Sequence, residues 1–161
     1  MSHEADQSLN PVLRTMLPGD IPAVHALEVA SFPADAWPVE LFEAELSQHE
    51  TRDYWVYEAE GQILGYAGLC TVLPFADVQT IAIRPDAQGQ GLGRKLMQVM
   101  IERARQRNAR DVMLEVREDN PVAIGLYLSL GFSKIHERAK YYRDGTDALI
   151  MRLRLREEET K

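Results

Sequence analysis

A glycine-rich loop between a predicted strand and a predicted helix is the first stretch whose residue types could do chemistry. Residues 78–83 are rich in β-branched side chains and predict a strand, which Pro85 ends because proline has no N–H to donate. Apolar residues recur at helical spacing from Leu92 onward and predict a helix. The loop and the first helical turn contain two glutamines and three glycines: Gln88, Gln90, Gly89, Gly91 and Gly93.

Such a loop is suited to binding an anion. The N–H groups at a helix N-terminus have no partner within the helix, the helix dipole favours negative charge there, and glycine lets a phosphate approach the backbone. Arg94 and Lys95 follow and can add positive charge. The spacing matches neither the P-loop, because Gly93 is not followed by Lys and then Ser or Thr, nor the G-x-G-x-x-G fingerprint. The loop therefore indicates a phosphate site of another type, or an ordinary glycine-rich turn.

A single carboxylate in an apolar strand is the second candidate. Residues 112–116 predict a buried strand that is apolar except for Glu115. Desolvation raises the pKa of a carboxyl group, which would make it a usable base near neutral pH. The alternative is a structural role in which Glu115 pairs with Arg117 or with another cation at the strand end. The residues alone leave both interpretations open.

A short helix follows this strand and carries two further polar side chains. Asn120 is suited to cap a helix that begins at Pro121 and ends before Gly131. Tyr127 lies within this helix, where a tyrosine is most often a core residue whose hydroxyl finds a partner. The four histidines are scattered and show no metal-ligand spacing, so no metal is expected.

The remaining elements must position these residues. Asp20 is expected to cap a first helix with Val24 and Leu27 facing inward, and a second helix is expected from Pro38. Phe32 and Trp37, in the loop between them, either line a substrate groove or close the edge of the core. The other expected elements are strands 12–17, 54–59 and 62–70, the last two joined by Glu60-Gly61, a turn over 71–76, and strands 132–137 and 148–155. The order β-α-α-β-β-β-α-β-α-β-β predicts an α/β (α+β) fold, a mixed sheet with helices on both faces.

Composition narrows the class of protein. The chain has 161 residues, 45% hydrophobic and 27% charged, which predicts one domain over 11–155 between a loose tail (1–10) and a charged tail (156–161). No membrane span or signal peptide is visible, and Cys70 is the only cysteine, so a cytoplasmic location is the default expectation. The net charge of −7 argues against nucleic-acid binding and favours a basic partner. The sequence does not indicate the oligomeric state.

Taken together, these segments resemble the GNAT superfamily of N-acetyltransferases. The loop fits its Gln-x-x-Gly-x-Gly pattern as Gln88, Gly91 and Gly93. A second stretch is similar to the bacterial ribosomal-protein alanine N-acetyltransferases. It consists of Leu114-Glu115-Val116-Arg117, then Asn120, and then the pattern Ala-x-x-Leu-Tyr-x-x-x-Gly-Phe, which ends at Phe132. The resemblance extends over residues 12–155 and is weaker before residue 50. Gly89 departs from it, since many relatives carry Arg or another long side chain there.

The resemblance implies a fold, a cofactor and roles for individual residues. It implies a mostly antiparallel sheet with a central splayed pair of parallel strands, and acetyl-CoA as co-substrate. Asn120 would contact the cofactor arm, Glu115 would be the general base, acting through water, and Tyr127 the general acid. The backbone of the first splayed strand would bind the pantetheine arm through Ile81, Ala82 and Ile83. The pyrophosphate would lie on the loop formed by Gln88, Gly89, Gln90, Gly91, Leu92, Gly93 and Arg94.

The resemblance also implies an acceptor. In that branch the acetyl group goes to the α-amine of an N-terminal alanine on a small-subunit ribosomal protein, and the aromatic loop 32–37 and the pair Tyr141-Tyr142 would wall the peptide groove. Two alternatives stay open: a GNAT enzyme that acetylates lysine side chains, polyamines or antibiotics, and a non-catalytic acyl-CoA-binding module. Retention of both Glu115 and Tyr127 argues against the second.

Overall fold

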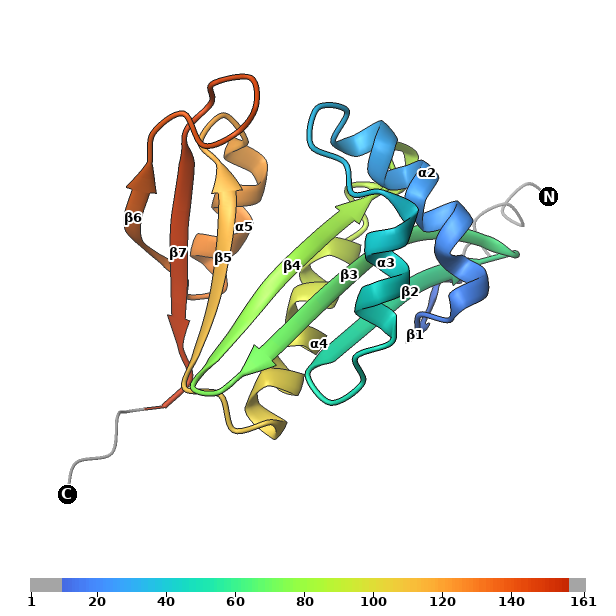
Figure 1. Cartoon of the computed structure of the whole chain (residues 1–161), viewed down its shortest axis with the longest axis horizontal. Coiled ribbons are helices and arrows are strands. Elements are labelled where there is room, and N and C mark those ends of the chain that lie inside the picture. Colours follow the sequence, from blue (N-terminus) through green and yellow to red (C-terminus); the bar gives the residue numbers. More distant parts are fainter. Residues whose placement is uncertain (1–9, 157–161) are drawn as a thin grey trace. The chain divides into compact units, whose positions relative to one another are not determined.

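The computed structural model describes residues 10–156 and has a mixed α/β fold with a seven-stranded sheet in the order β1-β2-β3-β4-β5-β7-β6 (Figure 1). Strands β4 and β5 are parallel, whereas β1–β2, β5–β7 and β6–β7 are antiparallel. This confirms the expected fold class. The elements are β1 (Val12–Thr15), η1 (Pro18–Asp20), α2 (Ile21–Ser31), α3 (Val39–Leu46), β2 (Arg52–Ala59), β3 (Gln62–Val72), β4 (Phe75–Ile83), η2 (Pro85–Ala87), α4 (Leu92–Gln106), β5 (Asp111–Arg117), α5 (Pro121–Ser129), β6 (Ser133–Arg138) and β7 (Ala148–Arg154).

The chain divides into two compact units. The first contains residues up to Gly68 together with Thr80–Met97, and the second contains Leu69–Gln79 together with residues from Gln98 onward. The expectation of a single domain over 11–155 stays a prediction. The two expected tails lie outside the described residues, apart from Asn10 and Arg156.

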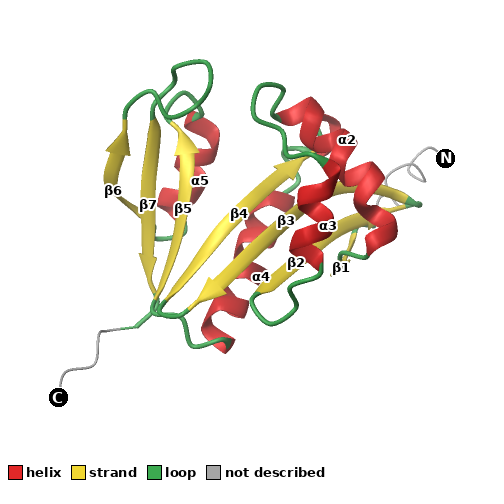
Figure 2. Cartoon of the chain, viewed as in Figure 1, coloured by secondary structure: helices red, strands yellow, loops and turns green. Residues whose placement is uncertain are grey.

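Helices cover both faces of the strands in the first unit. Figure 2 shows α2 and α3 on one face and the start of α4 on the other. The inward orientation expected for Val24 and Leu27 is confirmed, since both are buried in the core of this unit. Asp20 does not cap α2 through its side chain, so that expectation is wrong. A 3₁₀ turn precedes the helix, and the Asp20 carboxylate accepts the Leu17 N–H at 2.8 Å and pairs with Arg14 at 2.8 Å.

The hairpin between β2 and β3 forms at the expected residues. Glu60 and Gly61 both have positive φ, 53° and 76°, as a two-residue type I′ turn requires. The turn expected over 71–76 is shorter, because β3 continues to Val72 and β4 begins at Phe75. Pro74 lies in that turn, and Phe75 pairs with Asp111 of β5 in parallel register. The expected start of β4 at residue 78 is therefore three residues late.

Strand β5 is the central element of the second unit. Val112, Leu114 and Val116 are buried, whereas Met113 and Glu115 alternate with them on the more exposed face. The strand is followed by α5, which ends before Gly131 in a left-handed conformation with φ 103°, as expected.

A buried carboxylate that pairs with two arginines anchors the start of β5. Asp111 is fully buried and binds Arg110 at 2.9 Å and Arg154 of β7 at 2.5 Å. The carboxylate is therefore satisfied by two guanidinium groups.

Candidate active site

The glycine-rich loop is open and leads directly into helix α4. Gly89 and Gly91 have positive φ, 85° and 81°, and no protein atom outside their own chain neighbours lies within 4 Å of where a Cβ would stand. Both positions are therefore open on the side that a side chain would occupy. Helix α4 begins directly afterwards at Leu92, and the Lys95 N–H donates to the Gly91 carbonyl at 3.1 Å. The loop thus presents backbone amides at the N-terminus of a 15-residue helix.

A hydrogen bond connects the end of β4 to this loop. The Gln88 side-chain amide donates to the Ile83 carbonyl at 3.2 Å, so the first residue of the motif fastens the loop to the strand. Ala82 is buried, and Ile81 and Ile83 are half-buried. A Cβ at Gly65 of β3 would stand 2.6 Å from Ile83 Cδ1 and 3.0 Å from the Ala82 carbonyl oxygen, so only glycine allows this close approach.

Glu115 is exposed, so the expected burial of its carboxylate is wrong. The error came from the apolar run around it: Met113, on the same face of β5, is apolar without being part of the buried face. Arg117, the structural partner considered for Glu115, binds Asp119 at 3.0 Å and Asp144 at 2.6 Å.

Two residues interact electrostatically with Glu115: Asp77, which sequence reasoning did not assign to the site, and Tyr141, which it expected only as a wall of the peptide groove. Interaction with the Glu115 carboxylate raises the pKa of the Tyr141 hydroxyl. Burial, and secondarily the charge of Glu115, raise the pKa of Asp77. Asp77 stands opposite Met113 in the β4–β5 register and therefore shares the face of Glu115. The misplaced start of β4 hid Asp77, because it left this residue outside the expected strand.

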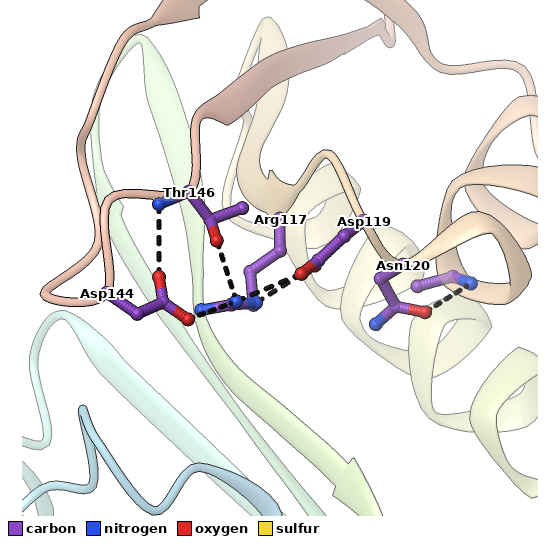
Figure 3. Close-up of polar contacts among 6 residues, drawn as sticks. Arg117, Asp119, Asn120, Asp144 and Thr146 are labelled. Carbon is purple, nitrogen blue, oxygen red and sulfur yellow. Dashed lines mark hydrogen bonds and ion pairs between the residues drawn. The ribbon is translucent and has the colours of Figure 1, made fainter.

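Tyr127 and Asn120 occupy the positions that the sequence predicted. Tyr127 is buried in α5, its ring 6.0 Å from that of Phe132, and burial raises its pKa to about 12. It is therefore a phenol that keeps its proton at neutral pH. Asn120 caps α5, since its side-chain oxygen accepts the Ala123 N–H at 3.2 Å (Figure 3).

The units divide the candidate residues between them. The loop 88–94 and residues 81–83 belong to the first unit, and Glu115, Asn120 and Tyr127 belong to the second. The structure brings the Gln88 side chain to the Ile83 carbonyl in the first unit.

The aromatic loop is held by a carboxylate that sequence reasoning missed. Glu28 of α2 is buried and accepts hydrogen bonds from the Tyr66 hydroxyl, from Thr80 at 3.2 Å and from the Trp37 N–H at 3.1 Å. Phe32 and Trp37 pack against the core of the first unit. Of the two interpretations of these rings, the structure supports the one in which they close the edge of the core.

Replacing Glu28 with glutamine is expected to lower the free energy of unfolding by about 1–3 kcal/mol. An amide offers one acceptor oxygen where the carboxylate offers two, so at least one of the three donors loses its partner. Denaturant titration measures the change. Glu40→Gln is the matched control, because Glu40 is an exposed residue of α3; equal stability of the two variants would contradict the prediction.

Comparison with known proteins identifies the family. The family model described as acetyltransferase (GNAT) family matches residues 21–132. The chain belongs to the GNAT family. It is 37% identical over 139 residues to the [ribosomal protein bS18]-alanine N-acetyltransferase of Escherichia coli K12. The aligned region covers 83% of this chain and 90% of that protein. The chain is 39% identical over 123 residues to the N-alpha-acetyltransferase RimI of Mycobacterium tuberculosis, 73% of this chain and 75% of that one.

A solved structure agrees with this assignment. The crystal structure of the ribosomal-protein-S18-alanine N-acetyltransferase from Escherichia coli superposes with a TM-score of 0.82 and 32% identity, covering 94% of this chain and 97% of that chain. The expectation of a GNAT enzyme that uses acetyl-CoA is confirmed. Within residues 10–156, no three or more His, Cys, Asp or Glu side chains are grouped so that they could hold a metal ion. In the same range, no helix has the length and apolar character needed to cross a membrane.

Proposed function

We propose that this GNAT enzyme acetylates the α-amine of an N-terminal alanine on a small-subunit ribosomal protein. The observation that carries the proposal is the 37% identity, over 90% of its length, to a relative named for that activity on ribosomal protein bS18. The net charge of −7 supports a basic acceptor, because opposite charge speeds the encounter. We place the reaction in the cytoplasm, and we expect no direct contact with nucleic acid or membrane.

The residues of the glycine-rich loop fit acetyl-CoA. Its pyrophosphate would be held by the amides of Gln88, Gly89, Gln90, Gly91, Leu92, Gly93 and Arg94. Open space at Gly89 and Gly91 supports this assignment. The backbone of Ile81, Ala82 and Ile83 would hold the pantetheine arm, together with Asn120. When bound, acetyl-CoA supplies the thioester carbonyl that the acceptor amine attacks.

Two side chains would move the protons. An α-ammonium must lose a proton before it can attack, and Glu115 would accept that proton through water. The exposure of Glu115 supports a route through water. Tyr127 would donate its proton to the departing thiolate, since burial keeps this phenol protonated. The transfer is direct, and no residue of the enzyme becomes acetylated.

The pKa of the acceptor amine favours an N-terminus over lysine. An α-amine has a pKa of about 7.7–8.0 and a lysine side chain about 10.4. Near neutral pH, a far larger fraction of the α-amine is therefore ready to attack. A single exposed carboxylate is then a sufficient base.

The proposal is tested by competition in one tube. One basic peptide carries a free N-terminal alanine, and the other has the same sequence with a blocked N-terminus and an internal lysine. Mass spectrometry should find the acetyl group on the α-amine, and added salt should slow the reaction. Preferential lysine labelling, or transfer only to polyamines, would show that the proposed N-terminal acceptor is wrong. The family assignment would still hold. Binding of acetyl-CoA without any CoA release would indicate a non-catalytic module.

A further inference from the structure

The last residue of β5, Arg117, joins that strand to the loop between β6 and β7, residues 139–147. Its guanidinium donates to the Asp144 carboxylate at 2.6 Å and to the Thr146 hydroxyl at 3.0 Å. It also donates to Asp119 at 3.0 Å, which lies on the segment directly after β5 (Figure 3). We call Arg117, Asp144 and Thr146 the loop clamp, because their contacts cross from the strand to the loop.

The loop also has an internal turn of its own. One oxygen of the Asp144 carboxylate, Oδ1, accepts the Thr146 N–H at 3.0 Å, whereas the other, Oδ2, accepts Arg117. The Gly145 N–H donates to the Tyr142 carbonyl at 2.9 Å, and the Tyr142 N–H donates to the Thr146 carbonyl at 3.1 Å. The guanidinium of Arg117 lies 5.0 Å from the ring centroid of Tyr142. The clamp therefore holds an ordered turn against the end of β5.

The clamp places this loop on the face of β5 that carries Glu115. Residues two apart on a strand point to the same face, so the Arg117 side chain reaches the loop from the face of Glu115. Arg117 stands opposite Ala148, where β7 begins, and Glu115 stands opposite Ile150. The loop therefore joins the sheet two residues, about 7 Å, beyond Glu115. The interaction with Glu115 that raises the pKa of Tyr141, a residue of this loop, agrees with that placement.

We propose that Arg117 is a positioning residue, which holds the loop 139–147 in place as a wall of the site for the acceptor peptide. This inference rests on the proposed function, in which the acceptor amine approaches Glu115. An extended peptide spans about 3.5 Å per residue, so the first two or three residues of an acceptor held at Glu115 are within reach of the loop. The loop offers them the ring of Tyr141, which is 43% exposed and meets the ring of Tyr142 edge-on at 5.1 Å.

The clamp is expected to act on the affinity for the peptide and not on the chemical step. No clamp residue exchanges a proton with the substrate, and Arg117 holds the pKa of Asp144 down to about 2, so the pair stays charged throughout the pH range of an assay. A loop that occupies its binding conformation for only a fraction of the time lowers the apparent affinity by that fraction. Loosening the clamp should therefore raise the KM of the peptide.

The test compares Asp144→Asn with Asp119→Asn. Each variant removes one carboxylate from Arg117, but only Asp144 lies on the loop. Asparagine at position 144 keeps an oxygen for the Thr146 N–H and loses the acceptor for Arg117, so the internal turn should survive. Asp144→Asn should raise the KM of a peptide with N-terminal alanine about 5- to 10-fold, with kcat and the Kd of acetyl-CoA unchanged. Asp119→Asn should keep all three values of the wild type.

Substitutions of Arg117 itself give a graded series. Arg117→Met removes every contact of the guanidinium and should raise the peptide KM at least as much as Asp144→Asn does. Arg117→Lys should recover part of the affinity, because lysine keeps the charge but cannot present two donors in a fixed fork.

Hydrogen exchange follows the loop without any acceptor. The N–H groups of Tyr142 and Gly145 should exchange faster in Asp144→Asn than in the wild type, and at the wild-type rate in Asp119→Asn. Equal effects of these two variants on the peptide KM would overturn the proposal. Faster exchange in the loop without a change in KM, or a fall in kcat alone, would also overturn it. If the enzyme instead modifies lysine or polyamines, and Asp144→Asn raises the KM of that acceptor, the role of Arg117 stands and the proposed function alone is contradicted.

Discussion

Replacing Glu115 with glutamine is expected to lower kcat by about 10²- to 10⁴-fold at pH 7, the usual contribution of a general base. Glutamine keeps the size of the side chain, but it cannot take a proton. The fold should be unaffected, because Glu115 is exposed on β5. Steady-state release of CoA with a free N-terminal alanine peptide measures the effect.

The pH dependence makes this prediction specific. The unprotonated fraction of an α-amine rises steeply up to its pKa of about 8, so the deficit of the variant should shrink toward pH 9. Glu118→Gln is the matched control, since it removes an equal charge from an exposed position three residues along the chain and should retain wild-type kcat. A deficit that stays constant from pH 6 to pH 9 would show that Glu115 acts through structure or binding rather than as a base.

The parts of the fold that the sequence predicted depend on local signals. The hairpin at Glu60-Gly61, the Asn120 cap and the Gly131 terminator each follow from the backbone preference of one or two residues. The glycine-rich loop was found in the same way, because a positive φ at Gly91 leaves a signature in residue type. Such features need no knowledge of distant parts of the chain.

The parts that the sequence did not reveal depend on partners far along the chain. Glu28 is satisfied by Tyr66 and Thr80, which lie 38 and 52 residues away, and nothing near Glu28 marks it as buried. Glu115 was expected to be buried because its neighbours are apolar, yet exposure on a strand alternates and depends on what covers each face.

Asp77 and Tyr141 show the same limit within the candidate site. Their electrostatic interactions with Glu115 arise only once β4 and the β6–β7 loop are placed beside β5. The argument from desolvation named Glu115 for a wrong reason, because its side chain is exposed. The role of Glu115 as the base, which the resemblance implies, stays a prediction.

Replacing Gly91 with aspartate is expected to weaken acetyl-CoA binding by about 100-fold. At about 4 Å, two like charges repel by about 1 kcal/mol in water and about 4 kcal/mol at a protein surface, and a 100-fold loss, about 2.7 kcal/mol, lies between these values. The variant should fold, since nothing lies within 4 Å of a Cβ at this position and aspartate tolerates the positive φ better than most residues. Calorimetric titration with acetyl-CoA gives the affinity directly.

Two controls separate charge from backbone strain in this experiment. Gly91→Asn has the same shape and the same tolerance of positive φ without the charge, so the ratio of the two affinities isolates the electrostatic part, which should fall as salt is added. Gly61→Asp places the same side chain at φ 76° in the β2–β3 hairpin, also with nothing within 4 Å, and should leave the affinity unchanged. If aspartate and asparagine at position 91 weaken acetyl-CoA binding equally at low salt, then no phosphate lies against the backbone N–H of residue 91. The pyrophosphate must in that case be bound elsewhere in the molecule.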